Sequence, residues 1–246
     1  MLPTLEGVMA RRVLLNFRAD AEVVQRQLPS PLLVDERNGT AIVGVCLVRM
    51  QQLRPKGFPA PFGSTSENMA HRVGVLYPDD EGRLRHGVFI WRRDTDQVLV
   101  RLLGGRLFPG VYHAADFHVS EDSEGMIMDV RSRDGITDVA FAASPTVWHP
   151  TKAFHSFESV SEFFRQGDCG FSCARNGELQ GMQLHTPRWR MEPLSIELHR
   201  AAFFADHNRF PSGSVEFDCA LVMRNLEHEW RRVPQLVRST QLVPAT

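Results

Sequence analysis

Lysine is almost absent from this chain of 246 residues: among its 28 basic side chains, only Lys56 and Lys152 are lysines. The scarcity matters because an enzyme that forms a Schiff base with a carbonyl substrate needs a lysine amine in its active site. Lys56 falls in a loop rich in proline and glycine, and Lys152 follows a proline. We expect both to be solvated surface residues.

Long apolar runs and blocks of like charge are also missing. No stretch approaches the roughly 20 apolar residues that cross a bilayer, and the net charge is −1 without a basic or acidic tract. We therefore expect neither a membrane nor a nucleic-acid partner. The N-terminal residues lack the apolar core of a signal peptide, so we expect a cytoplasmic protein.

Cysteine is scarce, and no metal-binding pattern is present. The spacing of Cys46, Cys169, Cys173 and Cys219 matches neither C-x-x-C nor a zinc motif, and we expect four free thiols. The ten histidines contain no H-x-H or H-E-x-x-H pattern. We therefore expect no metal and no cofactor.

The sequence is rich in short strand-like segments. Apolar, often β-branched runs predict strands over residues 13–18, 40–50, 69–77, 87–92, 111–119, 126–131, 138–142 and 215–223. Asn38-Gly39 signals a turn, and Asn176-Gly177 predicts a hairpin with a type I′ turn. Helices are expected over residues 21–28, 97–107 and 157–165, two of them after the candidate N-caps Asp20 and Ser156.

Many short strands with few helices favour an antiparallel α+β or barrel architecture. No repeat or change of composition divides the chain, so we expect residues 1–246 to form a single domain. The longest Pro/Gly-rich stretch, residues 53–66, is long enough to be a lid or a pocket wall.

Several short motifs resemble the acetoacetate decarboxylase superfamily. They are LPSPL at 28–32, GVCLVRMQQLRPKG at 44–57, GVFIWRRD at 87–94 and LHTPRW at 184–189. The chain is most similar to the branch of uncharacterised bacterial proteins grouped as DUF2071, or YqjF-like, over roughly residues 10–200. This resemblance implies a large antiparallel β barrel or cone with a few peripheral helices, which can enclose a ligand cavity.

The resemblance also implies positions for site residues. Glu67 matches a family glutamate by context, and a carboxylate there could bind or deprotonate a substrate. The alternative is a loop glutamate paired with an arginine. Arg11 or Arg12 falls near the family's arginine and could hold a substrate carboxylate, or both could be surface residues. A second family glutamate has no counterpart in Val43-Gly44-Val45.

The family's Schiff-base lysine is the clearest departure. It follows an aromatic–proline pair after a helix, and here the pair Phe108-Pro109 leads into Gly110-Val111-Tyr112-His113 without an amine. We predict that the protein is not a Schiff-base decarboxylase. Tyr112 and His113 stand almost in the lysine's place and point to opposite faces of a strand, so one of them is expected to face the cavity.

Trp189 is a further candidate for the pocket wall, although its position favours a packing role. Three functions stay open: a cavity that binds a small oxo- or carboxyl-bearing metabolite without chemistry, a lysine-independent lyase-like enzyme with Glu67 as acid/base and His113 or Tyr112 beside it, and a non-catalytic interaction module. The expected partner is a small molecule, and a homo-oligomer is compatible with each function. Fold alone does not choose among them.

Overall fold

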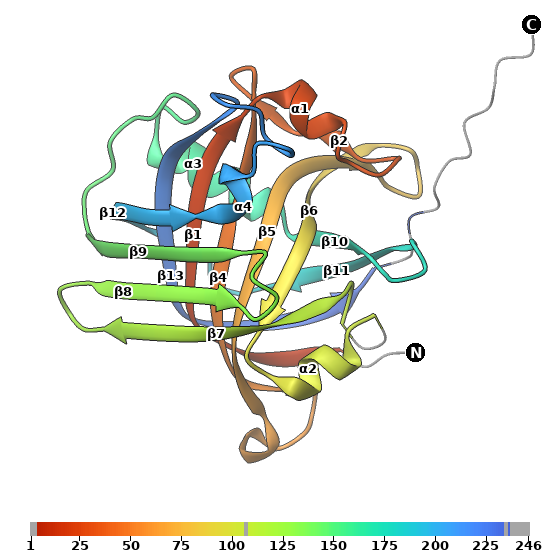
Figure 1. Cartoon of the computed structure of the whole chain (residues 1–246). Helices are drawn as coiled ribbons and strands as arrows, with labels where there is room; N and C mark the ends of the chain where they lie inside the picture. The colour runs from red at the N-terminus through yellow and green to blue at the C-terminus, as the bar shows by residue number, and fades with distance from the viewer. Residues whose placement is uncertain (1–3, 106–107, 234–235, 237–246) are drawn as a thin grey trace, which may run out of the picture.

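The computed structural model describes residues 4–105, 108–233 and 236, and most of the regular structure is β (Figure 1). The strands are β1 (Leu5–Ala19), β2 (Leu33–Val34), β3 (Glu36–Arg37), β4 (Thr40–Pro55), β5 (Ser64–Pro78), β6 (Leu84–Thr95), β7 (Tyr112–Glu121), β8 (Met126–Ser132), β9 (Asp138–Pro145), β10 (Cys169–Cys173), β11 (Leu179–His185), β12 (Glu192–Ala201) and β13 (Val215–Arg232). The helices are α1 (Ala21–Gln25), a 3₁₀ turn η1 (Ala60–Phe62), α2 (Val98–Leu103), α3 (Phe157–Gln166) and α4 (Ala202–Ala205).

The predicted strands are confirmed, but several are longer than their apolar runs suggest. β1 begins at Leu5 rather than residue 13, and β13 continues to Arg232 rather than residue 223. The helix expected over 21–28 ends at Gln25. The helix expected over 97–107 covers Val98–Leu103, and residues 106–107 lie outside the described residues.

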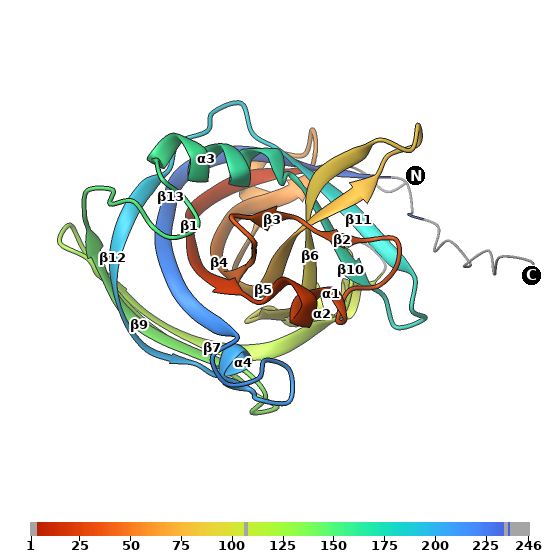
Figure 2. The same cartoon turned by 90° about the horizontal axis from the view of Figure 1, so that it is seen from above.

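Hydrogen bonding links the strands in the order β11-β10-β6-β7-β8-β9-β12-β13-β1-β4-β5-β2, with additional pairings β11–β13 and β5–β6. The additional pairings place β1, β4, β5, β6, β10, β11 and β13 in one closed series of neighbours, and β7, β8, β9 and β12 form a second layer beside it (Figure 2). Two pairings, β6–β7 and β6–β10, are parallel. The antiparallel architecture that the sequence favours does not hold at these two pairings; for β6–β7 the reason is that the connection through α2 returns the chain in the same direction.

The turns explain two of the connections. Asn38 and Gly39, with φ of 50° and 75°, join β3 to β4, as the Asn-Gly signal predicts. The β10–β11 hairpin is also confirmed. Its turn is not type I′. That turn needs a positive φ at both central residues, whereas Gly177 has a φ of 80° and Asn176 does not have a positive φ.

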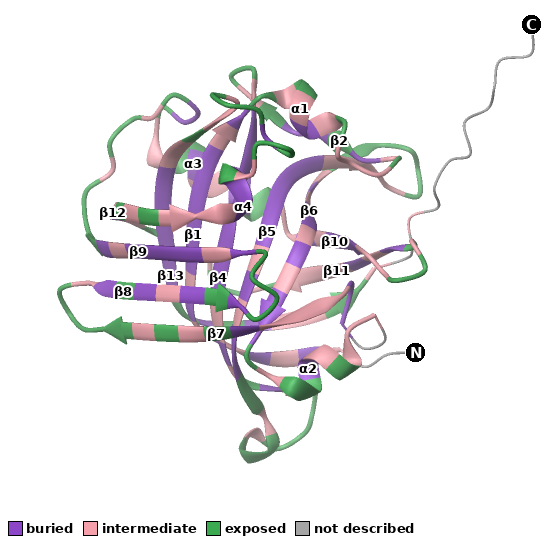
Figure 3. Cartoon of the chain, in the orientation of Figure 1, coloured by how far each residue is buried: buried purple, intermediate pink, exposed green. Residues whose placement is uncertain are grey.

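The strands of the closed series that lie against the second layer are shared by two interiors and are buried on both faces. Residues 41–47 of β4 are all buried, which is why this segment reads as a continuous apolar run rather than an alternating one. Figure 3 shows β4 and its neighbours as largely buried, and alternate residues of β4 belong to two different interiors. Val43, Val45 and Leu47 face one, whereas Ile42 and Cys46 face the other.

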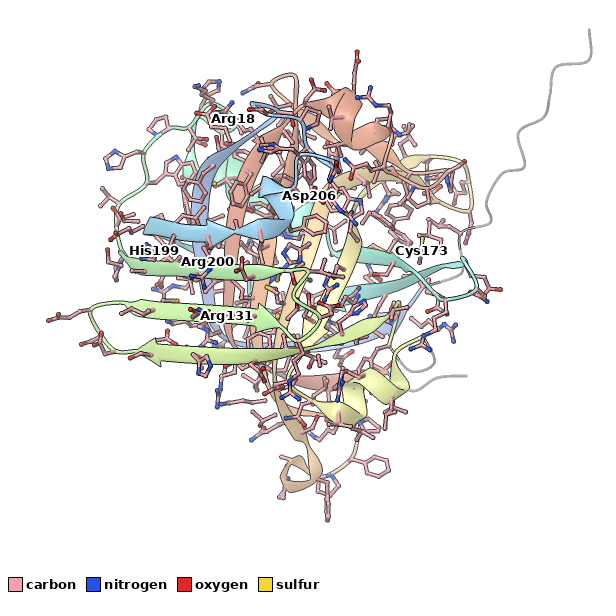
Figure 4. All side chains as sticks on the ribbon, in the orientation of Figure 1. Arg18, Arg131, Cys173, His199, Arg200 and Asp206 are labelled. Atoms are coloured by element: carbon pink, nitrogen blue, oxygen red, sulfur yellow. The ribbon has the colours of Figure 1, made fainter. Side chains whose placement is uncertain are left out.

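We call the first the packed interior. It lies between the shared strands and the second layer, and includes Val45, Phe141, Phe203, Phe204 and Phe210. The outward side of the second layer is polar: Arg200 of β12 pairs with Asp129 and Asp138, and Arg131 of β8 pairs with Asp129 (Figure 4). This alternation of apolar and charged residues fixes which face of the second layer is buried.

We call the second the cavity interior. It includes Leu14, Cys46, Phe108, Phe163 and Trp230, and α3 and α2 lie towards opposite ends of it (Figures 1 and 2). α3 starts with a capping box in which the Ser156 hydroxyl accepts a hydrogen bond from the backbone amide of Ser159. The cap orients the helix so that its buried phenylalanines cover the strands.

All four cysteines are free thiols, as expected. In the described part of the chain no helix is both long and apolar enough to cross a membrane.

Candidate functional site

The cavity interior contains a cavity of about 130 Å³. A single buried water needs roughly 10–15 Å³ on the same kind of measure, so the space suits a small organic molecule rather than one water. Its walls come mostly from β1, β4, β5, β6 and the α2–β7 connection, and are largely apolar. They include Val48, Met50, Ile90, Phe108, Leu184 and Trp230.

Four charged residues line this apolar cavity: Arg12, Arg72, Arg93 and Asp168. The carboxylate of Asp168 accepts a hydrogen bond from Gln183 Nε2 at 2.9 Å. Within the described residues, none of the three arginines lies within 4.0 Å of a carboxylate. Buried or half-buried arginines usually have a carboxylate partner, so three without one in a single cavity mark it as a candidate anion site.

Arg72 is the most deeply buried of the three, with 2% of its surface exposed. Its Nη2 donates to Asn16 Oδ1 at 2.7 Å, and its guanidinium lies 4.7 Å from the centre of the Phe164 ring. Nε and Nη1 are buried without a hydrogen-bond partner among the described residues. Burial lowers the pKa of Arg72 to about 10, and the charge of Arg12 acts in the same direction. Arg72 therefore stays charged at neutral pH, and two of its nitrogens, Nε and Nη1, are buried without a described hydrogen-bond partner.

Gly44 makes the contact between Arg72 and Asn16 geometrically feasible. It lies on β4 between Asn16 of β1 and Arg72 of β5. A Cβ atom at this position would lie 2.3 Å from Leu15 O and 3.3 Å from Asn16 Oδ1. In the segment where the resemblance implies a second glutamate, Gly44 thus leaves room for Arg72 to reach Asn16.

Arg12 lines the cavity, whereas its neighbour Arg11 faces the opposite side of β1. Arg12 Nη1 donates a long hydrogen bond to Met223 Sδ, at 3.8 Å. Arg12 also lies close enough to Arg72 to lower that residue's pKa. Of the two arginines suggested by the sequence, Arg12 is the one placed for a carboxylate ligand.

Tyr112 lines the cavity together with Phe108 and Pro109. The guanidinium of Arg93 lies 5.6 Å from the centre of the Tyr112 ring, and Arg93 Nε donates to Ser172 Oγ at 3.1 Å. A tyrosine beside an arginine therefore occupies the place where the resemblance puts the Schiff-base lysine.

Glu67 is buried, but it faces away from the cavity. Its neighbours Ser66 and Asn68 are lining residues, and strand alternation turns Glu67 to the other face. Both of its carboxylate oxygens accept from Arg11 Nη2, at 2.9 and 2.8 Å, and Arg49 Nη1 donates to Oε1 at 3.0 Å. The geometry expected for an acid/base at the cavity wall is therefore wrong for Glu67, although its expected arginine neighbours are present.

His113 and Trp189 also lie outside the described lining of the cavity. His113 Nδ1 is 3.5 Å from Asp134 Oδ2, on a charged cluster where Arg92 holds Asp134 at 2.8 Å and Asp94 at 2.7 Å. Trp189 Nε1 donates to Ser161 Oγ at 3.0 Å, which ties the indole to α3. His113 therefore contacts the cluster of Arg92, Asp94 and Asp134, and the Trp189 indole is held against α3.

Both lysines lie in exposed ion pairs. Lys56 Nζ is 2.6 Å from Glu229 Oε1, and Lys152 Nζ is 3.6 Å from Glu216 Oε2. Neither is among the described residues that line the cavity.

The sequence reasoning missed Arg72, Arg93 and Asp168. A signal for the first two exists: Arg72 interrupts an apolar strand run in MAHRVGVLY, and Arg93 is the second of two arginines that end the apolar run in GVFIWRRD. A charged residue that interrupts such a run is costly to bury, and a ligand-facing position is one explanation.

Comparison with known proteins places the chain in a family. The family model DUF2071, described as an uncharacterized conserved protein, matches residues 9–218. The chain belongs to this family. Among curated proteins, none matches the sequence.

Solved structures show the fold. Acetoacetate decarboxylase from Legionella pneumophila subsp. pneumophila str. Philadelphia 1 aligns with a TM-score of 0.58 and 17% identity, over 95% of this chain and 88% of that one. An acetoacetate decarboxylase-like enzyme from Sphingomonas wittichii RW1 gives 0.57 and 18%, over 94% of each chain. The enduracididine biosynthesis enzyme MppR complexed with pyruvate gives 0.52 and 10%, over 94% and 90%. This DUF2071 protein thus has the acetoacetate decarboxylase-like fold.

Proposed function

We propose that this DUF2071 protein binds a small oxo- or carboxyl-bearing metabolite, in a cavity enclosed by a barrel of the seven strands β1, β4, β5, β6, β10, β11 and β13. The observation that carries the proposal is the pair of guanidinium groups, Arg12 and Arg72, that face the cavity without a described carboxylate partner. A guanidinium has a planar set of N–H donors that matches a carboxylate, and such charge-assisted hydrogen bonds are strong.

The surroundings support a ligand rather than solvent alone. An uncompensated buried cation is costly, and a bound carboxylate would remove that cost. The apolar walls, including Val48 and Phe108, suit the hydrocarbon part of a short-chain acid. A neighbour in fold, MppR, has been crystallised with pyruvate, which makes 2-oxo acids a sensible first set of candidates.

The test is a calorimetric titration of the wild-type protein with pyruvate, acetoacetate and butyrate. The variant Arg12→Gln should bind the preferred acid about ten- to a hundredfold more weakly, because it loses a charged hydrogen bond. Arg49→Gln is the matched control, since Arg49 lies on the opposite face and pairs with Glu67. Equal loss in both variants, or no binding of any acid to the wild type, would contradict the proposal.

A lysine-independent enzyme is the second candidate, and Tyr112 is the observation that favours it. Among the three residues proposed for catalysis from the sequence, Tyr112 is the one that lines the cavity, and Arg93 lies beside its ring. A tyrosine hydroxyl next to a bound carbonyl group can donate or accept a proton. Deuterium exchange at the carbon beside the carbonyl group of a bound oxo acid, compared between wild type and Tyr112→Phe, would separate an enzyme from a binding protein.

A further inference from the structure

The charge of the cavity lining points to more than one carboxylate on the ligand. The described lining contains three arginines and one aspartate, and therefore carries two net positive charges. Arg72 keeps its charge at neutral pH, since its pKa of about 10 is well above 7. A monocarboxylate would leave one positive charge uncompensated in a largely apolar cavity, which is unfavourable.

Arg12 and Arg72 form one positive pole. Their positive charges repel each other, since the charge of Arg12 lowers the pKa of Arg72. A carboxylate near the two guanidinium groups would relieve this repulsion, and Arg72 Nε and Nη1 have no hydrogen-bond partner among the described residues. One carboxylate is therefore expected here, and the proposed function already assigns it.

Arg93 forms a second pole on another wall. It comes from β6 and is held by Ser172 of β10 and by the ring of Tyr112. These contacts orient the guanidinium but leave its charge without a described carboxylate partner. The Arg93 guanidinium is held in place and has no described counter-charge, so a second anionic group of the ligand could pair with it.

The rest of the cavity lining is largely apolar and includes Val88, Ile90 and Phe108. A single compact dianion such as phosphate cannot use apolar walls, whereas a short hydrocarbon chain with a carboxylate at each end can. The distribution of charge therefore favours a dicarboxylate.

We propose that the cavity selects a short-chain dicarboxylate, with one carboxylate at Arg12 and Arg72 and the other at Arg93. This inference rests on the proposed carboxylate-binding function and specifies its ligand class.

The test compares ligands that differ only in the second charge. Isothermal titration of the wild-type protein is carried out with succinate and with succinamate, in which one carboxylate is an uncharged amide of the same size. A parallel titration uses glutarate and glutaramate, in case the poles need a longer chain. At least one dicarboxylate should bind about tenfold or more tightly than its half-amide, as expected for one additional charged hydrogen-bonded pair.

Arg93→Gln then locates the second pole. In this variant the ratio of dicarboxylate to half-amide affinity should fall to about one, while the affinity for the half-amide stays within about twofold. Arg49→Gln again serves as the control and should keep the wild-type ratio, because Arg49 is paired with Glu67 on the other face.

Each outcome has a distinct meaning. Equal affinity of the wild type for a dicarboxylate and its half-amide would overturn this inference and leave the proposed function intact. Binding of neither, while pyruvate, acetoacetate or butyrate does bind, would overturn this inference alone, and binding of none of these acids would overturn both. Inorganic phosphate that binds more tightly than any dicarboxylate would show that the site recognises a compact dianion, and would also overturn the inference. The wild-type comparison decides the matter even if Arg93→Gln fails to fold.

Discussion

The two interiors share the same strands but differ in what fills them. In the packed interior, Phe141, Phe203 and Phe210 are buried against one another and against β-branched residues. In the cavity interior, the residues at alternate positions of the same strands include Arg12, Asn68 and Arg72, and a cavity remains. The difference teaches that each of these strands has one face that packs closely against the second layer and one face that lines a cavity.

Two consecutive residues of β5 face different interiors. His71 is stacked on Phe203 in the packed interior, with ring centres 4.4 Å apart, and Arg72, the next residue, faces the cavity interior. Variants on the two faces should therefore separate stability from binding.

The largest effect is expected from Phe203→Ala in the packed interior. The side chain is 3% exposed and packs on His71 and Phe204, so its truncation should lower the free energy of unfolding by about 3–5 kcal/mol. Chemical denaturation measures the change. Phe62→Ala is the control, because Phe62 is 79% exposed and should change stability by less than about 0.5 kcal/mol. Similar losses for both variants would break the comparison.

A pH dependence of stability is expected from His71. Burial, with the charges of Arg92 and Arg209, lowers its pKa from 6.5 to about 3. Below pH 6.5 the unfolded chain binds a proton that the folded one does not, so this residue's contribution falls as the pH falls towards about 3, by about 1.4 kcal/mol per pH unit. His71→Leu should reduce the slope of unfolding free energy against pH by that amount between pH 4.5 and 6. An unchanged slope would show that His71 is protonated in the folded state.

Gly44→Ala should lower the free energy of unfolding by a smaller amount, about 1–3 kcal/mol. The added Cβ would collide with the backbone carbonyl of Leu15 and crowd Asn16. The same change should loosen Arg72 and weaken ligand binding. Gly170→Ala is the matched control in a cavity-lining strand, where the nearest atoms to a Cβ lie 3.6 Å away. If thermal melting shows both variants equally stable, the account of how Arg72 reaches Asn16 is wrong.

No change at all is expected in a Schiff-base assay. Lys56 and Lys152 are held at the surface by Glu229 and Glu216. Borohydride reduction in the presence of acetoacetate should leave the intact mass unaltered. A stoichiometric adduct on either lysine would contradict the assignment of the cavity to arginines and Tyr112.

Many of the strands could be predicted from the sequence because they coincide with runs of apolar residues. The segment 40–50 is buried on both faces, and its unbroken run of apolar residues marks it clearly. β12 could not be predicted from the sequence because it lies in the second layer. Most of its ten residues are exposed or half-buried, and its sequence EPLSIELHRA has no strong apolar run. The strand depends on its partners β9 and β13 rather than on its own composition.

The site was harder to predict, and Glu67 shows why. Its place at a loop–strand junction is readable, but its facing depends on the register of β5, where bulges shift the pairing near Met50 and His71. A shift by one residue exchanges the two faces of a strand. The same uncertainty separated Arg11 from Arg12 and His113 from Tyr112. In each pair the structure places one residue at the cavity.

The most direct measurement is a crystal structure of the protein with a bound carboxylate, using the acid that binds most tightly in the titrations. The account predicts a carboxylate within hydrogen-bonding distance of the guanidinium groups of Arg12 and Arg72, with Glu67 still paired to Arg11 on the other face. A ligand bound outside the cavity, or a carboxylate that contacts neither Arg12 nor Arg72, would contradict it.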